Sequence, residues 1–253
     1  IRGGNDRDTI QGGGGADYLA GDQGDDEFRY FAGEVYGNDS VFGNVGDDKL
    51  MLWTSGTYDF IGLNLSQLEE IEFRGNGGNQ DKTLEIRGDE INDGFGFAGS
   101  FLIDSNGSTG SDDRLEIAMF IDSSINLSNA TFQDWDDVSD GGGDLIVVNG
   151  DGSSESLIGS VQSDSIVGNG GNDFIEGELG DDTLEGGTGT NTLSYGYAQP
   201  GGGPMLAEFF NINLATGTTT RTNSLSTLIE TDTFSGFQNV SGSGYGDTIT
   251  ANG

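Results

Sequence analysis

The sequence contains no cysteine and no histidine among its 253 residues. Without cysteine the chain can form neither a disulfide nor a thiolate metal site. Without histidine it lacks the commonest transition-metal ligand and the usual general base. Carboxylate and carbonyl oxygens are therefore the metal ligands that remain, and they favour hard cations such as Ca²⁺.

Basic residues are scarce as well. Nine Lys and Arg stand against 43 Asp and Glu, which leaves a formal net charge of −34. This charge opposes a compact state by self-repulsion and excludes nucleic acid as an expected partner. The sequence has no run of about 18 apolar residues, so it predicts no membrane span.

The apolar share of the chain is low at 32%, whereas glycine occurs 47 times. Glycine loses more conformational entropy on folding than any other residue, so hydrophobic burial alone is too weak to fix every turn. Disorder in the presence of the right cation is not expected, because Ile, Leu, Val and Phe recur at regular intervals and aromatic residues are frequent.

A nine-residue period explains this composition. The first three units are GGNDRDTIQ at 3–11, GGGGADYLA at 12–20 and GDQGDDEFR at 21–29, and the pattern resumes after a four-residue insertion as far as residue 51. Five further units occupy 150–194, and one occupies 242–250. In these units position six is acidic or amide and position eight is apolar.

The physics of one unit predicts how the units stack. Glycines permit the tight turn, whereas the short strand that follows cannot stand alone. If two units make one coil of 18 residues, position-eight side chains form a thin core between two parallel sheets. Position-six carboxylates of successive coils then lie about 4.8 Å apart and repel one another by roughly 3 kcal/mol at an effective dielectric near 20. A divalent cation between the coils removes this repulsion, and Ca²⁺ tolerates such flexible oxygen cages better than Mg²⁺ does.

The units match G-G-x-G-x-D-x-U-x and so resemble the repeats-in-toxin (RTX, haemolysin-type) calcium-binding nonapeptide family. The resemblance covers 3–51, 150–194 and 242–250. It implies an all-β fold, a right-handed parallel β-roll or β-helix solenoid with several Ca²⁺ ions in its turns. It also implies a secreted bacterial protein, exported by type I machinery and located outside the cell or on its surface. The metal-ligand aspartate of the family falls on Asp8, Asp17, Asp26, Asp39, Asp48, Asp164, Asp173, Asp182 and Asp247.

Three units depart from the family pattern. Asp6 replaces a turn glycine, Glu155 is longer than the usual aspartate, and Asn191 lacks the charge. We expect weak or empty calcium sites where these residues contribute.

The stretches without the period predict the remaining organisation. Alternating runs such as KTLEIRG and DRLEIAMFI read as strands, so we expect an irregular, wider solenoid over 52–149, with a β-sandwich insertion as the alternative. The arrays are then 1–51 and 150–194. Residues 195–253, which resemble a recurrent segment of large RTX proteins, form a coil with a side loop near Pro200 to Pro204 and a terminal repeat. Asp81, Asp112 and Asp113 are expected to be solvated loop acids, with calcium binding as the alternative.

These patterns predict a function. We expect a calcium-binding structural module that folds on binding Ca²⁺ outside the cell, as a fragment of a longer protein that begins inside a repeat at Ile1. The alternative is a cell-surface, biofilm or surface-layer module that binds extracellular polysaccharide or neighbouring copies of itself. Catalysis is not expected, because calcium accounts for most acidic pairs. A module appended to a polysaccharide lyase or epimerase is the less favoured alternative.

Overall fold

The computed structural model describes residues 1–35, 38–74, 81–88, 91, 102–105, 112–120, 123–135, 143–196, 208–223 and 228–251. Strands are nearly the only regular elements of these residues, and most of them pair in parallel, which confirms the all-β prediction. In the described ranges no helix has the length and apolarity needed to cross a membrane. The chain divides into two compact units, the first comprising 1–121 with 129–146 and the second 122–128 with 147–253.

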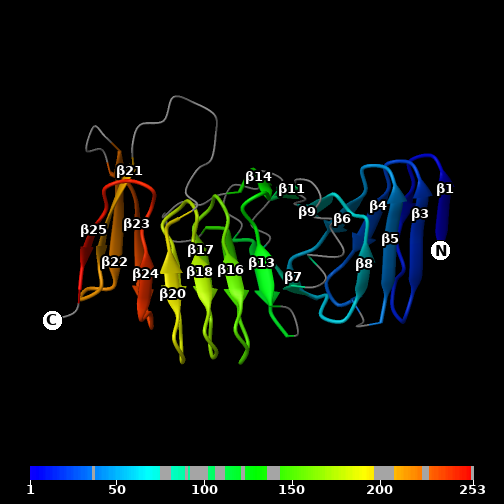
Figure 1. The fold of residues 1–253 in the computed structure, drawn as a ribbon. Coiled ribbons are helices and arrows are strands. Elements are labelled where there is room, and N and C mark those ends of the chain that lie inside the picture. The colour runs from blue at the N-terminus through cyan, green and yellow to red at the C-terminus, as the bar shows by residue number, and fades with distance from the viewer. Residues whose placement is uncertain are drawn as a thin grey trace. The chain divides into compact units, whose positions relative to one another are not determined.

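In the first unit, successive strands of the first array alternate between two parallel sheets (Figure 1). One sheet has the order β1 (Arg2–Asn5), β3 (Tyr18–Gln23), β5 (Ser40–Val45), β8 (Asn64–Ser66). The other has the order β2 (Thr9–Ile10), β4 (Glu27–Tyr30), β6 (Lys49–Leu52), β9 (Glu70–Phe73), β11 (Leu102–Asp104), β14 (Thr131–Gln133). A third row places β10 (Lys82–Arg87) between β7 (Gly56–Asp59) and β12 (Arg114–Ala118).

The second unit repeats the alternation. One parallel sheet has the order β13 (Ser124–Asn126), β16 (Ser156–Ile158), β18 (Phe174–Glu176), β20 (Thr192–Ser194), β24 (Asn239–Ser241) (Figure 1). The other row is β17 (Asp164–Val167), β19 (Thr183–Glu185), β23 (Leu228–Ser235), β22 (Thr218–Asn223), β21 (Glu208–Asn213), β25 (Thr248–Thr250). Strand β22 is antiparallel to both of its neighbours. Strand β15 (Leu145–Asn149) contains the boundary between the units.

Strand register shows the length of each coil. Thr9 pairs with Glu27 in the first array and Ser165 with Thr183 in the second, so one coil takes two nonapeptides. Between the arrays the strands still pair in parallel, but the coils are wider, as the pairing of Thr83 with Arg114 shows.

Position-eight side chains form the core. Those of both arrays are almost completely buried: Ile10, Leu19, Phe28, Val41, Leu50, Leu157, Ile166, Ile175, Leu184 and Leu193. The expectation is wrong for Ile249, which is 49% exposed. Among the described strands, its strand β25 pairs only with β21 and forms the edge of its sheet, so one side of Ile249 is left uncovered.

Several aromatic side chains add to this core. Tyr58 and Phe60 are fully buried in edge-to-face contact, with ring centroids 6.5 Å apart. Trp135 and Tyr195 are also buried, whereas Tyr197 lies outside the described residues, as does the side loop expected near Pro200 to Pro204. Packing therefore accounts for Tyr58, Phe60, Trp135 and Tyr195.

Candidate metal centre

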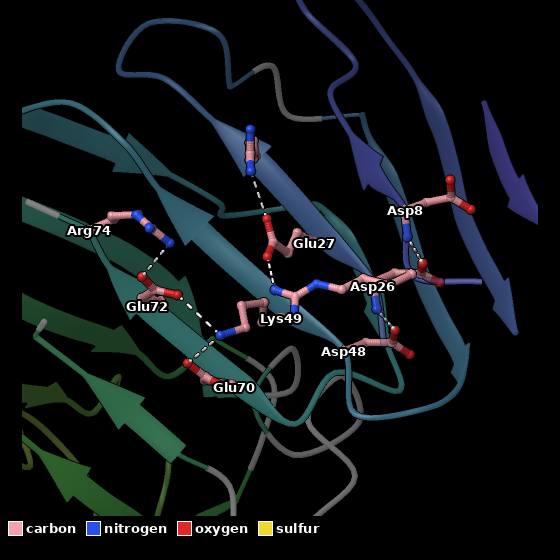
Figure 2. A network of polar contacts seen from close by, with 10 residues as sticks. Asp8, Asp26, Glu27, Asp48, Lys49, Glu70, Glu72 and Arg74 are labelled. Atoms are coloured by element: carbon pink, nitrogen blue, oxygen red, sulfur yellow. Dashed lines mark hydrogen bonds and ion pairs between the residues drawn. The ribbon is translucent and has the colours of Figure 1, made fainter. Parts of the chain in front are cut away.

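Residues at position six of successive coils are joined by hydrogen bonds. The backbone N–H of Asp8 donates to Asp26 Oδ1 at 2.7 Å, and the N–H of Asp26 donates to Asp48 Oδ1 at 2.8 Å (Figure 2). The chain thus places carboxylates one above another because each accepts a backbone donor from the coil before it. Hydrogen bonds to a carboxylate favour its charged form.

We call these rows the position-six ladder. Each step joins a backbone N–H to a side-chain oxygen one coil later, at 2.7–3.1 Å. The rows are Asp8–Asp26–Asp48–Glu69, Asp17–Asp39, Lys82–Asp113–Asp144, Glu155–Asp173–Asn191–Gln238 and Asp164–Asp182–Asp232.

The second oxygen of many ladder carboxylates is buried and accepts no hydrogen bond from the described residues. This holds for Oδ2 of Asp17, Asp26, Asp48, Asp113 and Asp173, and for both carboxylate oxygens of Glu155. A buried charge without a partner is costly, so each of these oxygens requires a positively charged or donating group, and in the two arrays no described side chain supplies one by a hydrogen bond.

At Asn191 an amide group takes the place of the second carboxylate oxygen and donates hydrogen bonds. It follows Asp173 in the ladder, and its Oδ1 accepts the N–H of Asp173 at 2.9 Å. Its Nδ2 donates to the carbonyl oxygens of Gly186 at 2.8 Å and Gly236 at 3.1 Å. In an aspartate unit Oδ2 takes the place of this Nδ2 and also faces glycine carbonyl oxygens. Two acceptors cannot bond to each other, so a cation is needed where Asn191 provides N–H groups.

The glycine at position one makes room for this arrangement. A Cβ on Gly168 would lie 2.6 Å from Asp173 Oδ2 and 2.8 Å from the carbonyl oxygen of Gly186. A Cβ on Gly3 would lie 2.8 Å from Asp8 Oδ2 and 2.7 Å from the carbonyl oxygen of Gly21. Carboxylate and carbonyl oxygens thus converge beside an open position, which is the donor set that Ca²⁺ prefers.

Three of the aspartates expected to bind metal have a protein partner for the second oxygen. Tyr30 donates its hydroxyl to Asp39 Oδ2 at 3.2 Å. The N–H of Ser160 donates to Asp164 Oδ2 at 2.6 Å, and the N–H of Ser243 donates to Asp247 Oδ2 at 2.7 Å. A serine at position two thus supplies a donor to the aspartate of its own unit.

The remaining expected ligands belong to the ladder with different degrees of burial. Asp8 is half-buried, whereas Asp182 is 2% exposed. Asp182 donates its backbone N–H to Asp232 Oδ1 at 3.1 Å. The structure therefore brings Asp17, Asp26, Asp48 and Asp173 into the geometry that most clearly needs a cation.

Burial makes the ionised forms of several ladder acids unfavourable. Burial raises the pKa of Asp48 to about 6, with the nearby charges of Asp26 and Glu69 adding to the effect. Burial and the neighbouring Asp151 and Asp173 raise the pKa of Glu155 to about 8. A positive charge beside them would reverse these shifts.

Four basic side chains near the first array pair with glutamates and so do not supply that charge. Glu27 accepts from Arg29 at 2.8 Å and also pairs with Arg7. Lys49 lies 3.1 Å from Glu70 and 3.2 Å from Glu72, which also pairs with Arg74 at 3.1 Å (Figure 2). Four of the nine basic residues are thus neutralised by glutamates at other positions.

The residues present fit a calcium ion held partly by the backbone. In the described ranges no three acidic side chains converge to hold a metal by themselves. Neighbouring carboxylates and glycine carbonyls must therefore act together, as the surroundings of Gly168 and Asn191 indicate.

Sequence reasoning missed the ladder residues of the wider coils, among them Glu69, Asp144, Asp232 and Gln238. The expectation that Asp113 is a solvated acid was wrong, because its side chain is fully buried. Asp81 and Asp112 are exposed, as expected of loop acids. The missed residues share one signal: an acid or amide lies two positions before an apolar or strand residue, as in Asp232-Thr233-Phe234.

Comparison with family models matches one family, the RTX calcium-binding nonapeptide repeat (4 copies), at residues 1–28, 36–52 and 149–193. These ranges cover most of the first and second arrays and confirm the resemblance drawn from the repeats. Comparisons with curated proteins and with solved structures found no match.

Proposed function

Since residues 1–28, 36–52 and 149–193 are RTX calcium-binding nonapeptide repeats, we propose that the chain is a calcium-binding structural module that folds when Ca²⁺ binds outside the cell. The parent is a secreted bacterial protein of the type I export class, and the module itself performs no catalysis. The ligands are the position-six aspartates, foremost Asp17, Asp26, Asp48 and Asp173, together with glycine carbonyls.

One observation carries this proposal. Asp173 Oδ2 is buried without a partner, and the next rung of the same row, Asn191, turns two N–H groups toward carbonyl oxygens. The aspartate side chains therefore lack the hydrogen bonds to neighbouring carbonyl oxygens that the Asn191 side chain makes. Bound Ca²⁺ supplies positive charge that joins carboxylate and carbonyl oxygens of neighbouring turns.

The energetics support folding on binding. A site filled at ten times its dissociation constant stabilises the folded state by about 1.4 kcal/mol, so about five sites contribute about 7 kcal/mol. This is comparable with the stability of a whole domain. Where calcium is scarce, as in a cytosol, the net charge of −34 would keep the chain expanded and competent for export.

Far-ultraviolet circular dichroism of the full chain, recorded with excess chelator and again with millimolar calcium, tests the proposal. We expect β structure to appear with calcium, with Mg²⁺ at equal concentration as the control. Equal spectra in chelator and in calcium would overturn calcium-driven folding.

A second candidate, binding of an extracellular polysaccharide, is favoured by the exposed Tyr18, which lies beside the half-buried Phe42. Tyr18 is 51% exposed, and its ring centroid lies 5.1 Å from that of Phe42. An exposed aromatic face can stack on a sugar ring. Retention of the calcium-loaded chain on alginate, reduced by Tyr18→Ala, would support this candidate, and no retention would exclude alginate as its ligand.

A further inference from the structure

Two basic side chains are buried inside the protein. Lys82 is fully buried, and Arg221 is 3% exposed. Both belong to coils in which the nine-residue period is interrupted, Lys82 at the start of β10 and Arg221 in β22. Burying a charge is costly unless it is paired, so the surroundings of each residue indicate its purpose.

Arg221 lies next to the ladder of the second unit. Its Nη1 donates to Glu230 Oε2 at 2.8 Å, across the antiparallel pair of β22 and β23. Burial raises the pKa of Glu230 to about 7, and Arg221 opposes that rise. Arg221 acts in the same direction on Asp232, the ladder residue of β23, and on Glu178, in the turn before β19.

Arg221 lies in β22, next to the strand that continues the ladder after β19. The turn 177–181 precedes β19, and one coil later the extended start of β23 replaces a glycine turn. Thr231 donates its N–H to Asp181 Oδ1 at 2.7 Å, and Asp182 donates to Asp232 Oδ1. The ladder thus continues through this coil, but an arginine on the neighbouring strand faces its acids.

Lys82 brings a positive charge to the ladder of the first unit. It occupies position six, where other units carry aspartate, and its N–H donates to Asp113 Oδ1 at 3.0 Å. Asp113 in turn donates to Asp144 Oδ1 at 2.9 Å. Burial lowers the pKa of Lys82, whereas Asp113, Asp81 and Asp144 act to raise it, so its ammonium lies in the field of three carboxylates.

We infer that Lys82 and Arg221 are internal counter-cations. In the two interrupted coils they supply the positive charge that Ca²⁺ supplies in the nonapeptide arrays, so these coils keep their structure without calcium. The inference rests on the proposed calcium sites of the arrays. Calcium would therefore order the arrays next to blocks that are already folded.

Hydrogen exchange followed by mass spectrometry tests this on the full chain, in excess chelator and in millimolar calcium. In chelator, peptides covering β10–β12 and β22–β23 are expected to stay protected, whereas those covering β3–β5 and β17–β19 lose protection. Equal loss in all four regions would overturn the inference. If β3–β5 and β17–β19 gain no protection from calcium, the proposed function fails instead.

Charge-removing variants sharpen the test. In chelator, Arg221→Met should lower protection of β22–β23 by about 100-fold or more, as expected when a buried charge loses its partner. The double variant Arg221→Met/Glu230→Gln should recover protection to within about tenfold, because the carboxylate that pairs directly with Arg221 is removed as well. Lys82→Met should act likewise on β10–β12.

The matched control is Arg2→Met, which removes an exposed pair with Asp22 and should change protection little. If Arg221→Met and Lys82→Met behave like this control in chelator, the inference is wrong. Should Arg221→Met be too unstable to purify, the double variant decides, since an unprotected β22–β23 in that variant would also contradict the inference.

Discussion

Asn191 Nδ2 donates a hydrogen bond of 2.8 Å to the carbonyl oxygen of Gly186, the first residue of its own nonapeptide. A second bond from the same nitrogen reaches Gly236 O, one coil later. A neutral amide thereby joins two turns that, in the aspartate units, present only acceptors to one another. Asn191 therefore joins neighbouring turns through its own hydrogen bonds, whereas Asp173 needs a cation to do so.

Asp173→Asn should therefore stabilise the second array without calcium and weaken its calcium binding. Its Oδ1 can still accept the N–H of Glu155, and its Nδ2 can donate to carbonyl oxygens as Asn191 does. In chelator we expect the free energy of unfolding to rise by about 1 kcal/mol, the usual net value of a hydrogen bond. In calcium, titration calorimetry should show weaker binding.

The control is Asp59→Asn, which removes the same charge from an exposed residue outside the ladder. A loss of stability in chelator for Asp173→Asn, or unchanged calcium binding, would contradict the assignment of Asp173.

Gly168→Ala should destabilise the second array of the calcium-loaded chain. The new methyl group would lie 2.6 Å from Asp173 Oδ2, closer than van der Waals contact allows. Overpacking of this kind costs about 1–3 kcal/mol. Thermal unfolding measures the effect, and Gly152→Ala is the matched control, because a Cβ there meets no atom within 4 Å. Equal melting temperatures for both variants would show that the carboxylate does not occupy this space.

Without calcium, stability should fall as pH rises. Burial raises the pKa of Asp113 to about 7 from its ordinary 3.8, despite the opposing charge of Lys82. A carboxyl group whose folded-state pKa is raised stabilises the fold fully below about pH 4 and loses that contribution as pH rises through about 7. The melting temperature in chelator should therefore be higher at pH 5 than at pH 8.

Asp113→Asn should flatten this pH profile, because asparagine does not titrate and can still accept the N–H of Lys82. A melting temperature in chelator that increases from pH 5 to pH 8 would show that buried neutral acids do not contribute.

Ile175→Ala should weaken the core of the second array and raise the calcium concentration needed for folding. Ile175 is fully buried between Leu157 and Leu193 of the neighbouring strands. Such truncations cost about 2–5 kcal/mol, and calcium titration followed by circular dichroism gives the shift in midpoint. Phe174→Ala, on the outward face of the same strand, is the control. Equal midpoints for the two variants would mean that position eight does not form the core.

The sequence was sufficient to predict the coils of the arrays, because a strict period fixes which residues stack. Position-eight residues such as Leu19 and Ile175 are buried as expected. The groups that donate hydrogen bonds to Asp164 and Asp39 differ in how far the sequence could have predicted them. Ser160 is adjacent in its own unit, but Tyr30 reaches Asp39 from a different strand, so only folded packing reveals that contact.

The wider coils show a second limit. Lys82 and Asp113 lie 31 residues apart in sequence but on neighbouring rungs of one ladder. A period of nine does not connect them, since their pairing depends on how much chain each coil accommodates. Solvent exposure of Asp113 was expected from its loop-like surroundings, whereas strand register places it inside.

Every step of the position-six ladder points the same way, from the N–H of an earlier coil to the side chain of a later one. The position-six N–H of a coil therefore has its ladder acceptor only when the next coil is in place. At position five the bonds run the other way, as where the N–H of Asp47 donates to Asp25 Oδ1 at 3.0 Å, so neighbouring coils stabilise each other in both directions.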